Sequence, residues 1–246
     1  MIDAISRDDV ATNFGTNGFA VVPDLADKPL LEEMRTVYDG MLDGSVPCPG
    51  TDRNLGGITR QIMLPHLHHP LFARNPALTK AKAIAAGLVN CADPAFFFSM
   101  LIYKPPGHPH ETPWHMDMAY AAMPMTAAST HWPNDVVAQF WLALDDVDTE
   151  MGCMEFIPRV QNQPMPEHHV ASGAPDDDGR LLAITDPASH LPLDTAVQCP
   201  LRAGSATVHG YSTPHYTGPN RSHRGRRAYI FSFTDRARLA ALTRKR

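Results

Sequence analysis

Two histidines and one aspartate in this sequence have the residue types and spacing of a metal site. His115 and Asp117 stand two positions apart in Trp114-His115-Met116-Asp117, so on a β-strand both side chains point to the same face. Far downstream, His215 supplies a second candidate imidazole. Two imidazoles and one carboxylate leave part of a metal's coordination sphere open, as non-haem Fe(II) oxygen chemistry requires. The competing interpretation of each histidine is a hydrogen-bonded residue of the core.

A basic side chain that could bind an acidic ligand follows His215. Arg226 begins a strand-like run through Phe233, and a buried guanidinium holds a carboxylate through two parallel hydrogen bonds. Thr217 is close enough in the chain to add a hydroxyl to such a site. Spacing alone does not single out Arg226, because it belongs to a cluster of four arginines: Arg221, Arg224, Arg226 and Arg227.

The composition is that of a folded domain rather than of a disordered or membrane-spanning chain. With 246 residues, 43% of them hydrophobic and 19% charged, the chain is long enough to bury one large core. It has no apolar run of membrane-spanning length, and its first residues lack the basic and apolar segments of a secretory leader. The four scattered cysteines form no CxxC pair, so we expect reduced thiols in a cytoplasmic protein: Cys48, Cys91, Cys153 and Cys199.

Basic residues gather at the C-terminal end of an otherwise acidic chain. Residues 201–246 contain ten Lys or Arg and one acid, Asp235, although the whole chain carries a net charge of −5. Aromatic platforms for stacking bases are not interleaved with these arginines, so nucleic acid is not an expected partner, and neither is a membrane. We expect Arg226 to serve a small acidic ligand and the segment from Arg236 to Arg246 to be solvated surface.

The pattern of apolar residues predicts helices first and short strands afterwards. Helices are expected over residues 6–14, ended by Gly15, over the segment from Asp27 to Met41, and over 76–89. Strands are expected over residues 19–23, 96–104, 136–144, 153–157, 206–209 and 228–233. Loops are expected over residues 44–70, 105–113, 119–134 and 158–195. This order indicates an α+β fold in which a helical flank covers an antiparallel sandwich or barrel.

Four motifs follow one another along the chain. They are Trp114-His115-Met116-Asp117, Gln139-Phe140-Trp141-Leu142-Ala143-Leu144-Asp145-Asp146, Gly152-Cys153-Met154-Glu155-Phe156-Ile157-Pro158, and the stretch from His215-Tyr216-Thr217 through Asn220 to Arg226. In this order they resemble the phytanoyl-CoA dioxygenase family, and the resemblance extends from Gly18-Phe19 to about Phe233. It implies a double-stranded β-helix, or jelly roll, that uses Fe(II), 2-oxoglutarate and O2.

The resemblance also implies a role for each candidate residue. His115, Asp117 and His215 would bind the iron. Arg226 would hold the C5 carboxylate of 2-oxoglutarate, Thr217 would assist Arg226, and Trp141 would line the cosubstrate pocket. The expected organisation is a single oxygenase domain over residues 1–246, with a mainly helical flank over 1–92, a jelly-roll core over 93–235 and a basic C-terminal tail over 236–246.

The activity implied by the resemblance is the oxidation of a small organic molecule, most readily its hydroxylation, with formation of succinate and CO2. Asp117 favours this outcome over halogenation, because related halogenases have a small residue at that position. The chain departs from the family at Met116, where Gln is usual, and at Arg159-Val160-Gln161, where Gly-Ser-His is usual. Methionines at 116, 118, 123 and 125 indicate a flexible apolar pocket for a lipid-like or natural-product substrate.

Two other functions are compatible with the same residues. One is a non-enzymatic jelly-roll module that binds a metal or ligand; the other is a cupin-type dioxygenase without 2-oxoglutarate, which would require His108 and His110. The histidines of His66-Leu67-His68-His69 are expected in a loop near a pocket mouth, and His209 is expected to be a core residue. The substrate and the oligomeric state stay open at this point.

Overall fold

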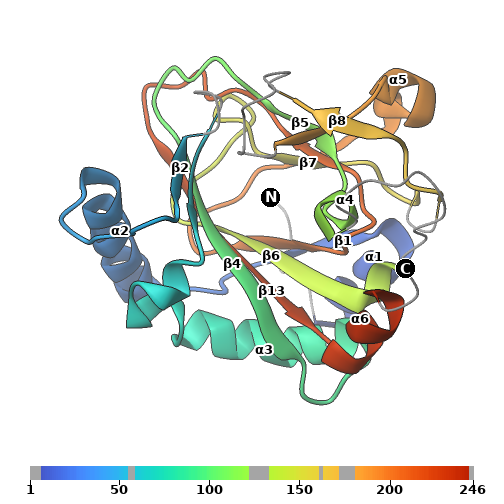
Figure 1. The fold of residues 1–246 in the computed structure, drawn as a ribbon, viewed down its shortest axis with the longest axis horizontal. Helices are drawn as coiled ribbons and strands as arrows, with labels where there is room; N and C mark the ends of the chain where they lie inside the picture. The colour runs from blue at the N-terminus through green and yellow to red at the C-terminus, as the bar shows by residue number, and fades with distance from the viewer. Residues whose placement is uncertain (1–6, 55–58, 122–132, 161–162, 172–180, 244–246) are drawn as a thin grey trace.

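Two antiparallel β-sheets face each other in the computed structural model, which describes residues 7–54, 59–121, 133–160, 163–171 and 181–243 (Figure 1). In spatial order, the large sheet consists of β1 (Phe19–Val22), β11 (Ala206–His209), β6 (Val137–Ala143), β13 (Arg226–Thr234), β4 (Ala95–Lys104), β3 (Arg60–Met63) and β2 (Asp52–Asn54). The small sheet consists of β10 (Val197–Cys199), β7 (Met154–Phe156), β12 (His215–Thr217) and β5 (Thr112–His115). The predicted α+β jelly roll is therefore confirmed.

Helices cover the outer face of the large sheet. The described helices of eight or more residues are α1 (Arg7–Asn17), α2 (Lys28–Asp43), α3 (Pro76–Leu88) and α6 (Arg236–Thr243), and α4 (Met118–Ala121) and α5 (Pro187–His190) are single turns. The Asp27 carboxylate caps α2 by accepting from the Leu30 N–H at 3.1 Å, and Asn75 caps α3 in the same way. In Figure 1, α3 runs beneath β4 and β13.

Two apolar cores follow from the alternation of side chains along the strands. On β4, Leu101 points outward into the core shared with the helices, whereas Ile102 points inward between the two sheets. Trp141 of β6 and Phe156 of β7 belong to the same inner core. The inner faces of both sheets therefore enclose the space in which the candidate site residues lie.

Three segments differ from the sequence-based expectation. The first helix passes Gly15 and ends at Asn17, because the left-handed backbone that stops it is at Gly18, with φ of 88°. Residues 44–70 are not all loop, because β2 and β3 lie within them; β2 pairs with β3, and β3 pairs with β4. These edge strands carry polar residues, so their formation depends on the neighbouring strand rather than on an apolar pattern.

The predicted loop over 158–195 also contains regular structure. β8 (His168–Val170) pairs with β9 (Leu182–Ile184), and α5 follows. Three-residue strands are too short to show an alternating pattern, which is why the sequence did not indicate them.

Parts of the predicted helical flank and of the predicted basic tail form strands and a helix of the main fold. The strands before residue 93, β1 to β3, belong to the large sheet, and the predicted basic tail forms α6 up to Thr243. Arg238 of this helix binds the Asp135 carboxylate with both terminal nitrogens, at 2.7 and 2.8 Å. No helix among the described residues is long and apolar enough to cross a membrane.

Candidate metal centre

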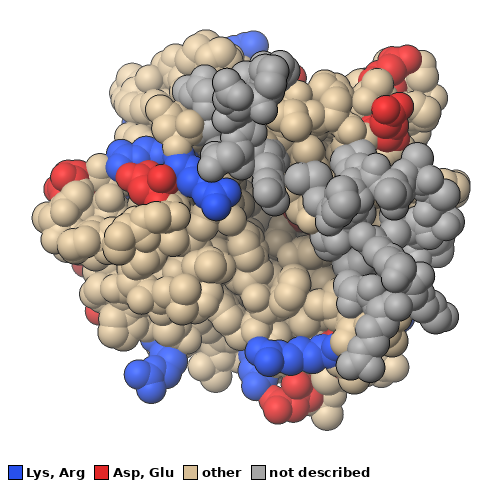
Figure 2. All heavy atoms as spheres, in the orientation of Figure 1, with Lys and Arg blue, Asp and Glu red and all other residues tan. Residues whose placement is uncertain are grey.

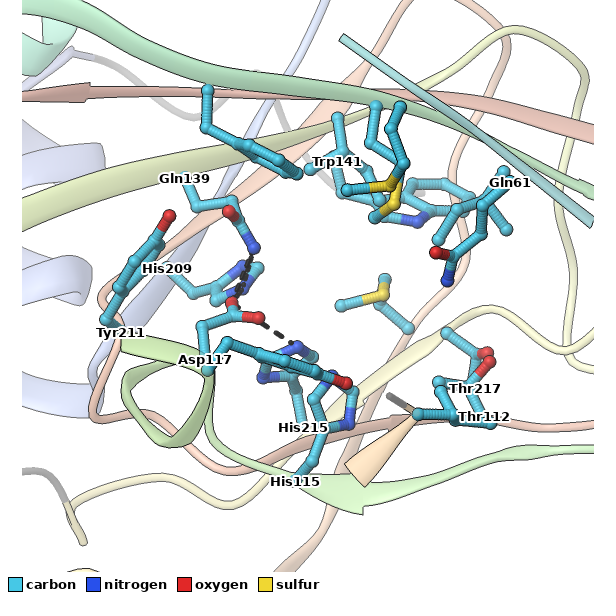
Figure 3. Close-up of a pocket in the computed structure, with 18 of the residues that line it drawn as sticks. Gln61, Thr112, His115, Asp117, Gln139, Trp141, His209, Tyr211, His215 and Thr217 are labelled. Atoms are coloured by element: carbon cyan, nitrogen blue, oxygen red, sulfur yellow. Dashed lines mark hydrogen bonds and ion pairs between the residues drawn. The ribbon is translucent and has the colours of Figure 1, made fainter. Parts of the chain in front are cut away.

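The neighbouring strands β5 and β12 of the small sheet bring three metal-ligating side chains together. His115 ends β5 and is paired across the small sheet with His215, the first residue of β12, while Asp117 follows β5. One ligand atom from each of the three residues lies within 4.8 Å of those of the other two. Figure 3 shows all three side chains pointing toward one another at the floor of a cavity.

Backbone carbonyls fix the orientation of both imidazoles. The His115 Nδ1 atom lies 2.7 Å from the Pro113 carbonyl oxygen, and the His215 Nδ1 atom lies 3.0 Å from that of Thr213. Nδ1 therefore carries the proton and Nε2 presents its lone pair to the centre. Burial lowers the pKa of His115 and, together with the neighbouring His115, lowers that of His215 well below its usual value. Both rings are thus neutral, as metal ligands must be.

Asp117 is held by two polar side chains of the large sheet. Its Oδ2 atom accepts a hydrogen bond from Gln139 Nε2 at 2.5 Å and faces His209 Nε2 at 3.2 Å. Burial alone would raise the pKa of Asp117, but the facing His215, His209 and His115 lower it below the ordinary aspartate value. The carboxylate is therefore ionised. Figure 3 shows it directed toward Gln139 and His209.

His209 and Gln139 are site residues that the sequence did not reveal. His209 lies on an apolar strand and is buried, as predicted, but its ring contacts Asp117 instead of serving only the core. Gln139 stands two residues before Trp141 on β6, so the alternation along the strand is the signal that places both on the cavity side.

The backbone between His115 and Asp117 is tied to β8. The Met116 N–H donates to His168 Nε2 at 3.1 Å, and His168 Nδ1 lies 2.8 Å from the Pro166 carbonyl oxygen. Burial lowers the pKa of His168 to about 4, so the ring stays neutral and accepts the Met116 hydrogen. The Met116 side chain packs in a separate buried cluster, away from the metal-facing side.

Arg226 is a buried cation that faces the cavity. Its side chain is 1% exposed, stacks over the Trp141 ring at 5.4 Å from the centroid, and donates from Nη1 to the Gly152 carbonyl. Nε has no partner, and none of the described acidic side chains forms an ion pair with it. Burial lowers the pKa of Arg226 to about 10, which leaves it charged at neutral pH.

Thr217 is bonded to a second buried basic side chain, Lys104. The Lys104 Nζ atom donates to Thr217 Oγ1 at 3.1 Å and to the Gly218 carbonyl at 2.8 Å. Because Oγ1 accepts from Lys104, the Thr217 hydroxyl hydrogen is available to an acceptor in the cavity. Lys104 is opposite Arg226 in the β4–β13 register, and burial together with Arg226 lowers its pKa to about 6.

The cavity has a volume of about 370 Å³ and joins the metal-facing residues to the Arg226 end. This size suits a small organic ligand. Its remaining wall is mostly apolar: Met63, Phe98, Met100, Met154, Leu181 and Ile230. Of the methionines predicted to line the pocket, Met116 and Met118 lie instead in the separate cluster, and positions 123 and 125 lie outside the described residues. The described methionines that line the cavity are Met63, Met100 and Met154.

The other histidines considered as metal ligands do not form a second metal site in the described part of the chain. His66 bonds the Ser99 hydroxyl and His68 bonds that of Thr51, so the histidines of that segment do not converge on one point. Within the described ranges, the group of His115, Asp117 and His215 is the one arrangement that could hold a metal, and it contains neither His108 nor His110. The cupin-type ligand set is therefore not assembled in the described part of the chain.

Comparison with known proteins decides the family. The sequence profile of the family described as phytanoyl-CoA dioxygenase matches residues 14–228, which is most of the chain. The chain belongs to the phytanoyl-CoA dioxygenase family. Relatives in this family include phytanoyl-CoA dioxygenase domain-containing protein 1 of Mus musculus, which is 26% identical over 174 residues, and that of Danio rerio, which is 28% identical over 167 residues.

The lengths of these relatives differ from that of the chain. The two alignments cover 70% and 68% of the chain but 55% and 53% of the relatives, so the chain spans about half the length of the curated proteins it matches. Solved structures match over more of their length. EvdO2 from Micromonospora carbonacea var. aurantiaca, complexed with 2-oxoglutarate, is 28% identical with a TM-score of 0.75, and the match covers 96% of this chain and 91% of that one.

A second solved structure shares the fold. The epimerase SnoN, in complex with Fe3+, alpha ketoglutarate and nogalamycin RO, has a TM-score of 0.69 at 21% identity, over 93% of this chain and 83% of that chain. The two matches show that this phytanoyl-CoA dioxygenase family member shares its two-sheet fold with these solved structures.

Gln139→Leu is expected to weaken Fe(II) binding by about 10- to 100-fold, because it removes the donor that orients Asp117 Oδ2. The dissociation constant is measured by anaerobic equilibrium dialysis, and the visible spectrum of the Co(II)-substituted protein reports the coordination geometry. Unchanged Fe(II) affinity with an unchanged Co(II) spectrum would show that Gln139 does not position the carboxylate.

Proposed function

We propose that this protein is an Fe(II)- and 2-oxoglutarate-dependent oxygenase that oxidises a small organic molecule. One observation carries the proposal: two neutral imidazoles and an ionised carboxylate face the same cavity as a buried arginine without a described acidic partner. The donor set fits Fe(II), because two imidazoles and one carboxylate leave positions for a chelating cosubstrate and O2. The Arg226 guanidinium fits the C5 carboxylate of 2-oxoglutarate, which is a dianion.

One set of side chains is proposed to bind the metal, and another is proposed to bind the cosubstrate. His115, Asp117 and His215 hold the iron, and Gln139 with His209 keeps one oxygen of Asp117 turned toward the large sheet. Arg226 binds the C5 carboxylate of 2-oxoglutarate through its guanidinium, and Thr217 donates its hydroxyl to the same carboxylate. Trp141 lies against the guanidinium and excludes water from it.

The chemistry that Fe(II) supplies when bound is the oxidative decarboxylation of 2-oxoglutarate coupled to oxidation of the substrate. In the hydroxylation that we propose, one atom of O2 enters succinate, the other enters the substrate as a hydroxyl, and the C1 carboxyl group leaves as CO2. The protein contributes geometry, a dry pocket and fixed charges. The whole reaction occupies a single domain over residues 1–246 in this proposal.

The relatives support the same assignment. The solved EvdO2 structure holds 2-oxoglutarate, and its match extends over nearly the full length of this chain. The curated relatives are named for phytanoyl-CoA dioxygenase, whereas the solved structures include proteins that act on or bind natural products such as nogalamycin RO. The family name and the nogalamycin RO bound by SnoN both support a small organic substrate.

The test is succinate formation by the purified protein supplied with Fe(II), 2-oxoglutarate and O2 in the absence of an added substrate, which detects uncoupled turnover. We expect succinate and CO2 in equal amounts, and loss of both when Fe(II) is withheld or chelated. A protein that binds Fe(II) but forms no succinate with any substrate tested would instead be a metal-binding jelly-roll module.

A further inference from the structure

The outer edge of the large sheet adds a cation to the rim of the cavity. Arg53 on β2 and Gln61 on β3 both line the cavity. They are paired directly across the two strands, and Gln61 is paired in turn with Ile102 of β4. The three side chains therefore form one row on the cavity face, with the charge at the outermost strand.

Arg53 differs from the neighbouring Arg60 in its partners. Arg60 is neutralised, because its Nε and Nη2 atoms donate to the two Asp52 oxygens at 3.0 and 2.6 Å, and it does not line the cavity. No described acidic side chain forms an ion pair or hydrogen bond with Arg53. Figure 2 shows basic atoms beside the hollow at the position of β2 in Figure 1. Among the described residues, the positive charge of Arg53 is therefore not neutralised, so it can bind an anionic ligand.

An apolar wall continues from this row toward the metal centre. Met63 is paired with Met100, which is paired with Ile230, and all three line the cavity. A β-bulge between Phe96 and Phe98 adds Phe97, which lines the cavity while 43% of its surface stays exposed. An exposed phenylalanine beside flexible methionines is the surface that an apolar ligand covers.

Arg53 and Arg226 are separate binding points. β2 lies three strands from β13, so about 14 Å of sheet separates the backbones that carry the two guanidiniums. Arg226 lies beyond the Trp141 ring at the enclosed end of the cavity, while Arg53 is only half-buried at its open end. One molecule of 2-oxoglutarate on Arg226 therefore leaves Arg53 and the apolar wall to the second reactant.

We propose that the substrate is an amphipathic organic anion, whose carboxylate or phosphate binds Arg53 and Gln61 and whose apolar body lies along the Met63–Met100–Ile230 row toward the metal centre. The assignment of this ligand as a substrate rests on the proposed function. The binding site itself requires neither iron nor turnover, so its test is a binding measurement.

The experiment is isothermal titration calorimetry of the full chain with three probes of equal chain length, decanoate, decyl phosphate and decan-1-ol, each below its aggregation concentration. Wild type is expected to bind at least one anion about tenfold more tightly than the alcohol, because a half-buried arginine gives a modest charge-assisted bond. Arg53→Gln is expected to abolish the preference. Arg60→Gln is the matched control and is expected to keep it.

The calorimetry results either support or overturn the proposed anion site at Arg53. A preference for decanoate or for decyl phosphate that depends on Arg53 supports it and identifies the anionic group. Equal binding of alcohol and anions, no binding of any probe, or loss of the preference in both arginine variants would overturn it. Circular dichroism and thermal unfolding establish that Arg53→Gln is folded. Succinate formation by wild type is measured separately, so a failure of the oxygenase assignment is distinguishable from a failure of this site.

Discussion

Replacing Arg226 with glutamine is expected to raise the 2-oxoglutarate concentration for half-maximal succinate formation by about 30-fold or more. Removing one partner of a buried charge pair costs about 2–5 kcal/mol, and each 1.4 kcal/mol is about a factor of ten in affinity. Arg226 is 1% exposed, so solvent does not screen its interaction with a carboxylate. Glutamine removes the positive charge and keeps a polar amide that can donate hydrogen bonds.

The measurement is steady-state succinate formation as a function of 2-oxoglutarate concentration, together with the iron content of each variant. Arg226→Lys keeps the charge but loses the planar fork, so its requirement should lie between those of wild type and Arg226→Gln. Arg224→Gln is the matched control, because Arg224 is half-exposed and contacts Met151 and Asp148 rather than the cavity. Equal cosubstrate dependence in Arg226→Gln and wild type would remove Arg226 from this role.

Loss of any one metal-facing side chain is expected to abolish iron-dependent succinate formation. In His215→Ala and Asp117→Ala, we expect a fall of more than about 100-fold, since even residues that only orient ligands change metal affinity or activity by about 10- to 100-fold. Iron content after anaerobic loading and desalting is the direct readout, and succinate formation is the second.

Met116→Leu provides the control for these two variants. Met116 lies between two of the proposed ligands, but its side chain is buried in an apolar cluster away from the cavity, and leucine has a similar volume. Iron content and turnover close to those of wild type are expected. If His215→Ala and Asp117→Ala retained iron as well as Met116→Leu does, the ligand assignment would be wrong.

The parts of the fold that the sequence predicts are those with a strong local signal. The helix after Asp27 has a capping carboxylate, a proline in its first turn and an apolar stripe, and it forms as α2. The long apolar runs of β4, β6 and β13 form the centre of the large sheet. The family and its jelly roll follow from four ordered motifs, and both are confirmed.

The features that the sequence does not predict depend on strand register. His209 reaches Asp117 because β11 pairs with β6 so that His209 lies opposite Gln139, a contact between residues far apart in the chain. Arg53 lines the cavity because a short polar strand adds to the edge of the large sheet through β3. Neither residue has a local pattern that distinguishes it from an ordinary core histidine or surface arginine.

The buried guanidinium of Arg226 also couples folding to cosubstrate binding. Folding removes this charge from water without providing a described acidic partner, so the ligand-free native state bears a desolvation cost that the unfolded chain avoids. A dicarboxylate that occupies the site compensates the charge only in the folded chain. With Arg226 in its proposed role, mass action makes the folded fraction of this protein increase with the 2-oxoglutarate concentration.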